Sequence, residues 1–151
     1  MATDSEDPFK LQRFVEAQAR DHAQALRELR AGRKTSHWIW YVFPQLRGLG
    51  ASAMSQFYGI ASAREAQAYF AHPVLGPRLR ECVSAMNDHA GRSADDILGA
   101  IDALKFRSCL TLFGAVAPEE ILFTRALANF FEGEGDPATL ARLSAQRHAP
   151  R

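Results

Sequence analysis

The residues best suited to chemistry lie in one segment, 33–50, which reads RKTSHWIWYVFPQLRGLG. Four of the six residues from Trp38 to Phe43 are aromatic, and they include both tryptophans of the chain. Hydroxyl, imidazole, amide and cationic side chains surround these rings. Polar groups beside large apolar surfaces must be hydrogen-bonded or contact a ligand, and ligand pockets combine the same elements. The segment is therefore the first candidate for a binding or active site.

The distribution of charge indicates the same segment. The net charge is only +1, which excludes a protein that binds polyanions through bulk charge. No acidic residue occurs between Glu28 and Glu65, a gap of 36 residues. The gap contains five unopposed cations, Arg30, Arg33, Lys34, Arg47 and Arg64. Glycines such as those at positions 48 and 50 allow backbone N–H groups to approach an anion, so we expect an anionic ligand.

Proton transfer in such a site would fall to His37, with Ser36 beside it. Imidazole is the side chain that changes its charge near neutral pH without help, which makes His37 the candidate acid or base. No two histidines stand at metal-ligand spacing, so we predict no metal site, and no cofactor is assigned.

The predicted ligand would be small, anionic and partly planar, such as a nucleotide or an ADP-ribose-like compound. Cations would hold its phosphate and an indole ring would stack on its base. The predicted ligand-binding residues of the segment are Arg33, Lys34, Trp38, Trp40, Gln45, Gly48 and Gly50. Two other interpretations stay open. In the first, Trp38, Trp40 and Phe43 are core anchors and contact no ligand. In the second, the cations form ordinary surface ion pairs with acids from other helices, such as Asp95, Asp96 or Glu119.

A second candidate strip consists of Lys105, Ser108 and Thr111, with Arg107 nearby. In a helix the three-residue spacing places the first three on one face, where Lys105 and Ser108 would reach the same ligand. In a strand Ser108 would point to the opposite side and the group would dissolve. The alternative for a helix is an ordinary solvated face.

The elements that position these residues are predicted to be helices. The chain has 26 Ala but only five each of Val, Ile and Thr, so an all-β fold is excluded. Apolar spacing and capping residues predict helices in seven places. These are residues 7–32, 51–58, 62–72, 74–91, 93–98, 118–131 and 136–147. Asp102 is expected to cap one more apolar segment, in which residues 106–113 fit a helix or a strand.

We therefore predict a single compact all-α domain over residues 7–147, with a long aromatic, glycine-containing loop after the first helix. Residues 1–6 and 148–151 are expected to be tails. The acidic N-terminus and the lack of a long apolar run predict a cytoplasmic protein with no membrane segment. Two isolated cysteines, Cys82 and Cys109, predict buried, reduced thiols, although a disulfide between them stays open.

Several runs of the sequence resemble a bacterial family known as domain of unknown function 1810. They are DPFKLQRF (7–14), AGRKTSHWIWYVFPQLRGLG (31–50), AHPVLGPRLREC (71–82) and LKFRSCLTLF (104–113). The resemblance implies a mainly helical single domain and supplies no reaction. Some members carry a calpastatin-like label, but an inhibitor of that kind is a disordered chain, whereas this one has apolar helices and 15 aromatic residues.

Two functions follow as alternatives. The first is a ligand-binding protein, or an enzyme, with a pocket around Arg33–Gly50. The second is an interaction module whose exposed aromatic patch docks a partner protein. A pI of 7.9 and the lack of a recognised motif do not favour nucleic acid. A homodimer is compatible with the sequence.

Overall fold

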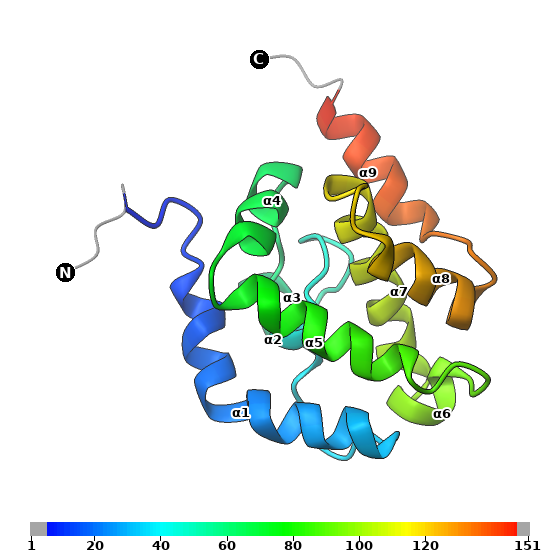
Figure 1. The fold of residues 1–151 in the computed structure, drawn as a ribbon. Coiled ribbons are helices and arrows are strands. Elements are labelled where there is room, and N and C mark those ends of the chain that lie inside the picture. The colour runs from blue at the N-terminus through cyan, green and yellow to red at the C-terminus, as the bar shows by residue number, and fades with distance from the viewer. Residues whose placement is uncertain (1–5, 148–151) are drawn as a thin grey trace.

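The computed structural model describes residues 6–147, and this part of the chain folds entirely into helices and loops (Figure 1). The all-α prediction is confirmed. The helices are α1 (Gln12–Ala31), α2 (Ile39–Val42), α3 (Ala53–Phe57), α4 (Ala63–Ala71), α5 (Leu75–Asn87), α6 (Ala94–Leu98), α7 (Ala100–Val116), α8 (Ile121–Phe131) and α9 (Pro137–Arg147). The predicted tails fall on residues 1–5 and 148–151, outside the described residues, except for Glu6.

Helix α7 lies at the centre of the packing. It contacts α2, α4, α6, α8 and α9, while α5 packs against α1, α4 and α8. Phe106 and Phe113 on α7 are fully buried and contact rings from other elements. The Phe106 ring lies 4.6 Å from that of Phe43, and the Phe113 ring lies 5.4 Å from that of Tyr69. The aromatic residues after α1 are thereby joined to the main core.

Three helix starts and one helix end coincide with residues that cap or stop helices. Ser62, Ser93 and Asp136 each accept a backbone N–H three residues later, at 3.2, 3.0 and 2.9 Å. Gly32 ends α1 in the left-handed conformation with φ of 76°. Local side-chain chemistry therefore defines these boundaries.

The observed helix bounds decide three expectations about local structure. Residues 106–113 are helical, as part of α7. Asp102 is not the cap of that helix, because α7 begins after Gly99 and Asp102 lies in its first turn. Helix α1 begins at Gln12 rather than near Asp7, although the Asp7 carboxylate still accepts the backbone N–H groups of Leu11 and Gln12 at 2.8 and 3.0 Å.

The two cysteines are free and buried, so no disulfide joins them. Burial raises the pKa of the Cys82 thiol to about 12, and burial also raises the pKa of Cys109 well above its ordinary value. Both thiols are therefore protonated at neutral pH. Within residues 6–147, no helix has the length and apolar character needed to cross a membrane.

Candidate functional site

The first part of the segment, residues 33–38, is folded around the carboxylate of Glu28 on α1. Glu28 is only 5% exposed. One of its oxygens accepts the backbone N–H groups of Thr35 and Ser36 at 2.8 and 3.0 Å, and the indole N–H of Trp38 at 2.9 Å. The other accepts the Ser36 hydroxyl at 2.5 Å and the Gln24 amide at 2.8 Å. Five donors thus satisfy this buried carboxylate.

These hydrogen bonds control the protonation of Glu28. Burial acts to raise its pKa, but the donors, led by the Ser36 hydroxyl, outweigh burial and hold the pKa far below the ordinary value of 4.5. The carboxylate is therefore charged at neutral pH. A charged acceptor strengthens each of the hydrogen bonds that fix residues 35–38.

Trp38 is a core anchor, as the alternative interpretation proposed. It is 1% exposed, and its ring packs against Phe43 at 6.1 Å. The Lys34 ammonium lies 5.0 Å from the centre of the same ring. No face of the indole remains for a ligand. Trp40, in contrast, is only half-buried.

The cations of the acid-free segment are not all unopposed, which corrects the expectation from sequence. The Lys34 ammonium is 2.8 Å from an Asp102 oxygen and donates to the Ser36 carbonyl at 2.6 Å. Arg30 is 3.7 Å from Glu81. The opposing acids come from α7 and α5, because packing brings those helices against residues 29–34.

Arg33 and His37 are both exposed. Neither lines the groove described next, and Lys34, Ser36 and Trp38 do not line it either. The predicted site is therefore divided into two parts. The part nearest α1 is occupied by internal contacts, and the later part faces an open hollow.

We name this hollow the Lys105 groove. It has a volume of about 400 Å³ and lies between residues 45–55, the first half of α7 and the start of α9. Four predicted residues meet in it, namely Gln45, Gly50, Lys105 and Ser108. The remaining lining residues are Leu49, Ala51, Ser52, Ser55, Ile101, Leu104, Asp136 and Ala138. The groove thus combines apolar walls with a few polar groups.

The charge of the groove depends on Asp102. One Asp102 oxygen binds Lys34 at 2.8 Å, while the other lies 3.9 Å from the Lys105 ammonium. One carboxylate therefore serves two lysines, and the trio keeps a net positive charge. Lys34 is 6% exposed and Lys105 is 21% exposed, so the accessible member is the one that lines the groove.

The polar strip of α7 shares one face, as the helical interpretation predicted, but this face is not solvated. Ser108 and Thr111 are buried, and their hydroxyls donate to the carbonyls of Leu104 and Arg107 at 3.2 and 2.8 Å. Thr111 also accepts the backbone N–H of Asp136 at 2.8 Å. The strip therefore joins the start of α9 to the groove.

Trp40 and Gly48 lie beside the Lys105 groove. Trp40 lines a small adjoining hollow of about 10 Å³, which Gln45 and Lys105 share with the groove. Gly48 has φ of 98°, and the Arg142 side chain of α9 lies against it and donates to its carbonyl at 3.2 Å. Arg142 therefore covers one side of Gly48, while Gly48 also lines a separate open hollow of about 460 Å³ with Arg47, Leu49, Gly50, Ala51 and Gln56.

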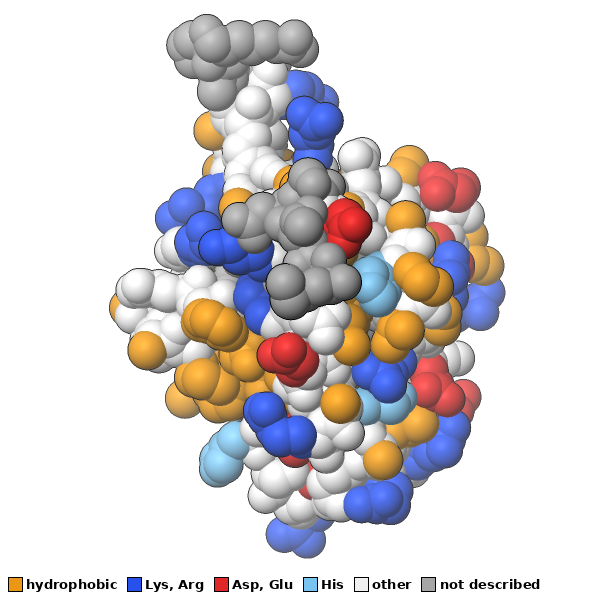
Figure 2. Space-filling view, turned by 90° about the vertical axis from the view of Figure 1, so that its left-hand side faces the viewer, with side chains coloured by type: hydrophobic (Ala, Val, Ile, Leu, Met, Phe, Trp, Pro, Cys, Tyr) orange, Lys and Arg blue, Asp and Glu red, His pale blue; other side chains and the backbone are white. Residues whose placement is uncertain are grey.

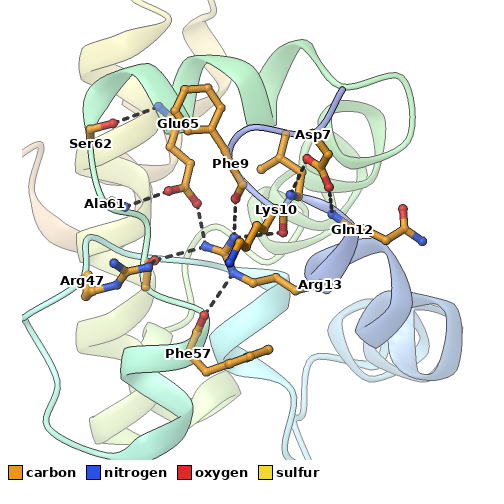
Figure 3. A network of polar contacts seen from close by, with 12 residues as sticks. Asp7, Phe9, Lys10, Gln12, Arg13, Arg47, Phe57, Ala61, Ser62 and Glu65 are labelled. Atoms are coloured by element: carbon orange, nitrogen blue, oxygen red, sulfur yellow. Dashed lines mark hydrogen bonds and ion pairs between the residues drawn. The ribbon is translucent and has the colours of Figure 1, made fainter. Parts of the chain in front are cut away.

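A network around Arg13 holds the loop that forms one wall of the groove (Figure 3). Arg13 pairs with Glu65 at 2.6 Å and donates to the carbonyls of Phe57 and Gly59. Arg47 donates to the same Gly59 carbonyl at 3.3 Å. A short bridge pairs Leu46 with Ile60, next to Gln45. The wall is therefore anchored to α1 and α4.

A family model matches residues 8–143 of this sequence, under the description Protein of unknown function (DUF1810). The chain belongs to this family. A solved structure of the conserved hypothetical protein Rv1873 from Mycobacterium tuberculosis is 49% identical and superposes with a TM-score of 0.89. The match covers 91% of this chain and 98% of that one. A comparison with curated proteins found no significant match.

Sequence reasoning missed several residues of the site in this DUF1810 protein. Glu28 precedes four of its five hydrogen-bond donor groups by 7–10 residues, and in the sequence it looks like an ordinary charged residue of a helix. Asp102 was predicted to cap a helix, not to join two lysines. Ile101 and Leu104 are 71% and 64% exposed, although their residue types predict burial. The only signal was the position of Glu28 at the edge of the acid-free segment.

The histidines have structural partners in most cases. His22 is 3.1 Å from Glu81, and the Nδ1 of His72 accepts the backbone N–H of Val74 at 3.0 Å. A ring nitrogen of His89 is 2.7 Å from the Leu29 carbonyl oxygen. Across residues 6–147, no three His, Cys, Asp or Glu side chains are grouped to hold a metal ion.

Proposed function

We propose that this DUF1810 protein binds a small anionic molecule in the Lys105 groove. The observation that carries the proposal is the Asp102 carboxylate shared by Lys34 and Lys105. Because one negative charge faces two positive charges, Lys105 retains attraction for an anion. The groove also has the mixed apolar and polar lining that is typical of small-molecule sites.

Two further polar lining groups, an acid and an amide, bear on the charge of the ligand. Asp136 is the one acidic residue of the lining, and an oxygen of its carboxylate accepts the backbone N–H and hydroxyl of Thr139 at 2.9 and 2.6 Å. It is thus engaged as the cap of α9. Gln45 supplies an amide beside Lys105, and amide N–H groups donate to phosphate or carboxylate oxygens.

The apolar walls support a ligand with a planar or apolar part, such as a nucleotide or an ADP-ribose-like compound. We place that part against Leu49, Ile101 and Leu104 instead of between the two tryptophans. Trp38 is buried, and the hollow beside Trp40 has room for no more than about one water molecule. The anionic part would then contact Lys105.

In this proposal Lys34 and Ser36 do not contact the ligand but hold the residues next to the groove in place. Lys34 holds Asp102, and Ser36 holds both Lys34 and Glu28. Catalysis by His37 and Ser36 stays a prediction. Because the Ser36 hydroxyl is bound to Glu28 and His37 does not line the groove, we propose binding alone. A cytoplasmic location likewise stays a prediction.

The alternative of an aromatic docking patch has no specific observation in its favour. It required the rings of residues 38–43 to be exposed, whereas Trp38, Tyr41 and Phe43 are between 1% and 3% exposed. We therefore put forward ligand binding as the function.

A nucleotide panel tests the proposal. The thermal shift of the protein is measured with nucleoside mono- and diphosphates and with ADP-ribose. The affinity of the best binder is then measured by calorimetry for the wild type and for Lys105→Gln. We expect at least about tenfold weaker binding, since a charge-assisted contact to the anion is lost. Lys10→Gln is the matched control, because Lys10 is exposed and does not line the groove. The proposal fails if no member binds, or if Lys105→Gln binds as well as Lys10→Gln.

A further inference from the structure

A second hollow lies away from the Lys105 groove, between the start of α4, the end of α7 and the end of α9. Its volume is about 360 Å³. Val116 and Leu143 give it apolar walls, and Arg64 and Arg147 line it from opposite elements, α4 and α9. It shares no lining residue with the Lys105 groove. We call it the two-arginine hollow.

The walls of this hollow are fixed to one another by Gln146. Its amide donates to the Ala61 carbonyl at 3.0 Å and accepts the Ala63 backbone N–H at 3.3 Å. The end of α9 is thereby tied to the start of α4. This contact ties together the helix segments that carry Arg64 and Arg147.

No acidic side chain lines the two-arginine hollow. Among the described residues, neither Arg64 nor Arg147 forms an ion pair, whereas Arg13 and Arg80 pair with Glu65 and Glu120. Helix α9 contains two arginines and no acid. Figure 2 shows Lys and Arg side chains gathered in the upper left part of the molecule, above an apolar patch.

We propose that the two-arginine hollow binds an organic phosphate monoester. Two guanidinium groups carry two positive charges, and a phosphate monoester carries about −1.5 to −2 at neutral pH, so the charges match. Guanidinium also forms paired hydrogen bonds with phosphate oxygens. Val116 and Leu143 accommodate the apolar part of the ester. A carboxylate, with one charge, leaves half of the site unneutralised.

Titration of the full chain with phenyl phosphate, monitored through its amide NMR shifts, tests this proposal. Saturable shifts are expected at residues 63–67 and 143–147, around the hollow. Arg64→Gln and Arg147→Gln should each weaken binding by about tenfold. Arg125→Gln is the matched control, because Arg125 is an exposed arginine of α8 outside the hollow. The amide spectrum of each variant also reports whether it is folded.

Four results would overturn the proposal. One is the absence of saturable shifts, and another is binding in the two variants equal to that of Arg125→Gln. The third is benzoate binding as tightly as phenyl phosphate, since the charge argument requires the phosphate to bind more tightly. Shifts confined to residues 45–55 and 101–108 would locate the ligand in the Lys105 groove and also contradict this second site. Any of these results would leave the proposed function of the Lys105 groove untouched, because the nucleotide panel tests that function separately.

Discussion

The two parts of segment 33–50 have similar residue types and opposite fates. Residues 33–38 contain cations, a hydroxyl and an indole, and most of these groups are bound to Glu28 or Asp102. Residues 40–50 also combine aromatic, amide and glycine residues, yet Gln45 and Gly50 line an open groove. The difference is a buried carboxylate within hydrogen-bond distance of the first part. Polar residues that look like a ligand site in the sequence thus serve the fold where a side chain from another element takes up their hydrogen bonds and charges.

The largest expected effect comes from removing the carboxylate that organises residues 35–38. Glu28→Gln replaces a charged acceptor of five hydrogen bonds with a neutral amide, so we expect a loss of about 3 kcal/mol in the free energy of unfolding. Urea denaturation measures it. Glu16→Gln, an exposed position on the same helix, should change stability by less than about 0.5 kcal/mol. Equal stability of the two variants would refute the organising role of Glu28.

The same contact predicts a pH dependence. The pKa of Glu28 is lower in the folded protein than its ordinary value of 4.5, so its stabilisation is complete above that pH. It is lost as the pH falls below 4.5 toward the folded pKa. The stability difference between wild type and Glu28→Gln should therefore be smaller at about pH 3 than at neutral pH. A difference that stays constant or grows on acidification would contradict the assignment.

Substitution of the two tryptophans allows a direct comparison of residues 33–38 with residues 40–50. Trp38→Phe removes buried volume and the N–H donated to Glu28, and we expect it to cost about 2–3 kcal/mol. Trp40→Phe, at a half-buried position, should cost less than about 1 kcal/mol. Thermal and urea unfolding of both variants give the order. A reversed order would mean that Trp38 is not the anchor.

A smaller effect is expected for the carboxylate that joins the two parts. Asp102→Asn leaves Lys34 without its ion pair, at a cost of about 1–2 kcal/mol in stability. It also removes negative charge 3.9 Å from Lys105, so binding of an anion identified for the groove should tighten by roughly threefold. Asp88→Asn, at an exposed position, is the control. Weaker anion binding in Asp102→Asn would show that Asp102 does not restrain Lys105 electrostatically.

The smallest effect on stability is expected at the groove itself. The ion pair of Lys105 is long, at 3.9 Å, so Lys105→Gln should change the free energy of unfolding by less than about 0.5 kcal/mol. Differential scanning calorimetry measures it. A loss as large as that of Trp38→Phe would make Lys105 a structural residue, as the first part of the segment is.

The sequence predicts what depends on neighbouring residues. The caps at Ser62, Ser93 and Asp136 and the stop at Gly32 are local, and each is found where its residue type indicates. The expectation for Asp102 was wrong because its partner Lys34 lies on another element. Periodicity left residues 106–113 undecided because α7 is apolar on nearly every face, as a central helix must be.

The candidate site follows the same rule. Lys105 and Ser108 were predicted together from helical spacing, and both line the groove. That they lie beside Gln45 and Gly50 depends on how residues 45–55 pack against α7, and local sequence patterns do not predict this packing. Glu28 was not predicted as an organiser, because a lone glutamate on a helix is usually solvated.

The attachment of α9 has a consequence for the order in which the chain becomes organised. Arg142 bonds to Gly48 and Gln146 bonds to Ala61, residues 94 and 85 positions earlier. Contacts of such long range form only after the intervening chain exists. During synthesis, the contacts of Gly48 and Ala61 with α9 therefore form only once that helix is available, and the Lys105 groove gains its third wall only after α9 has left the ribosome.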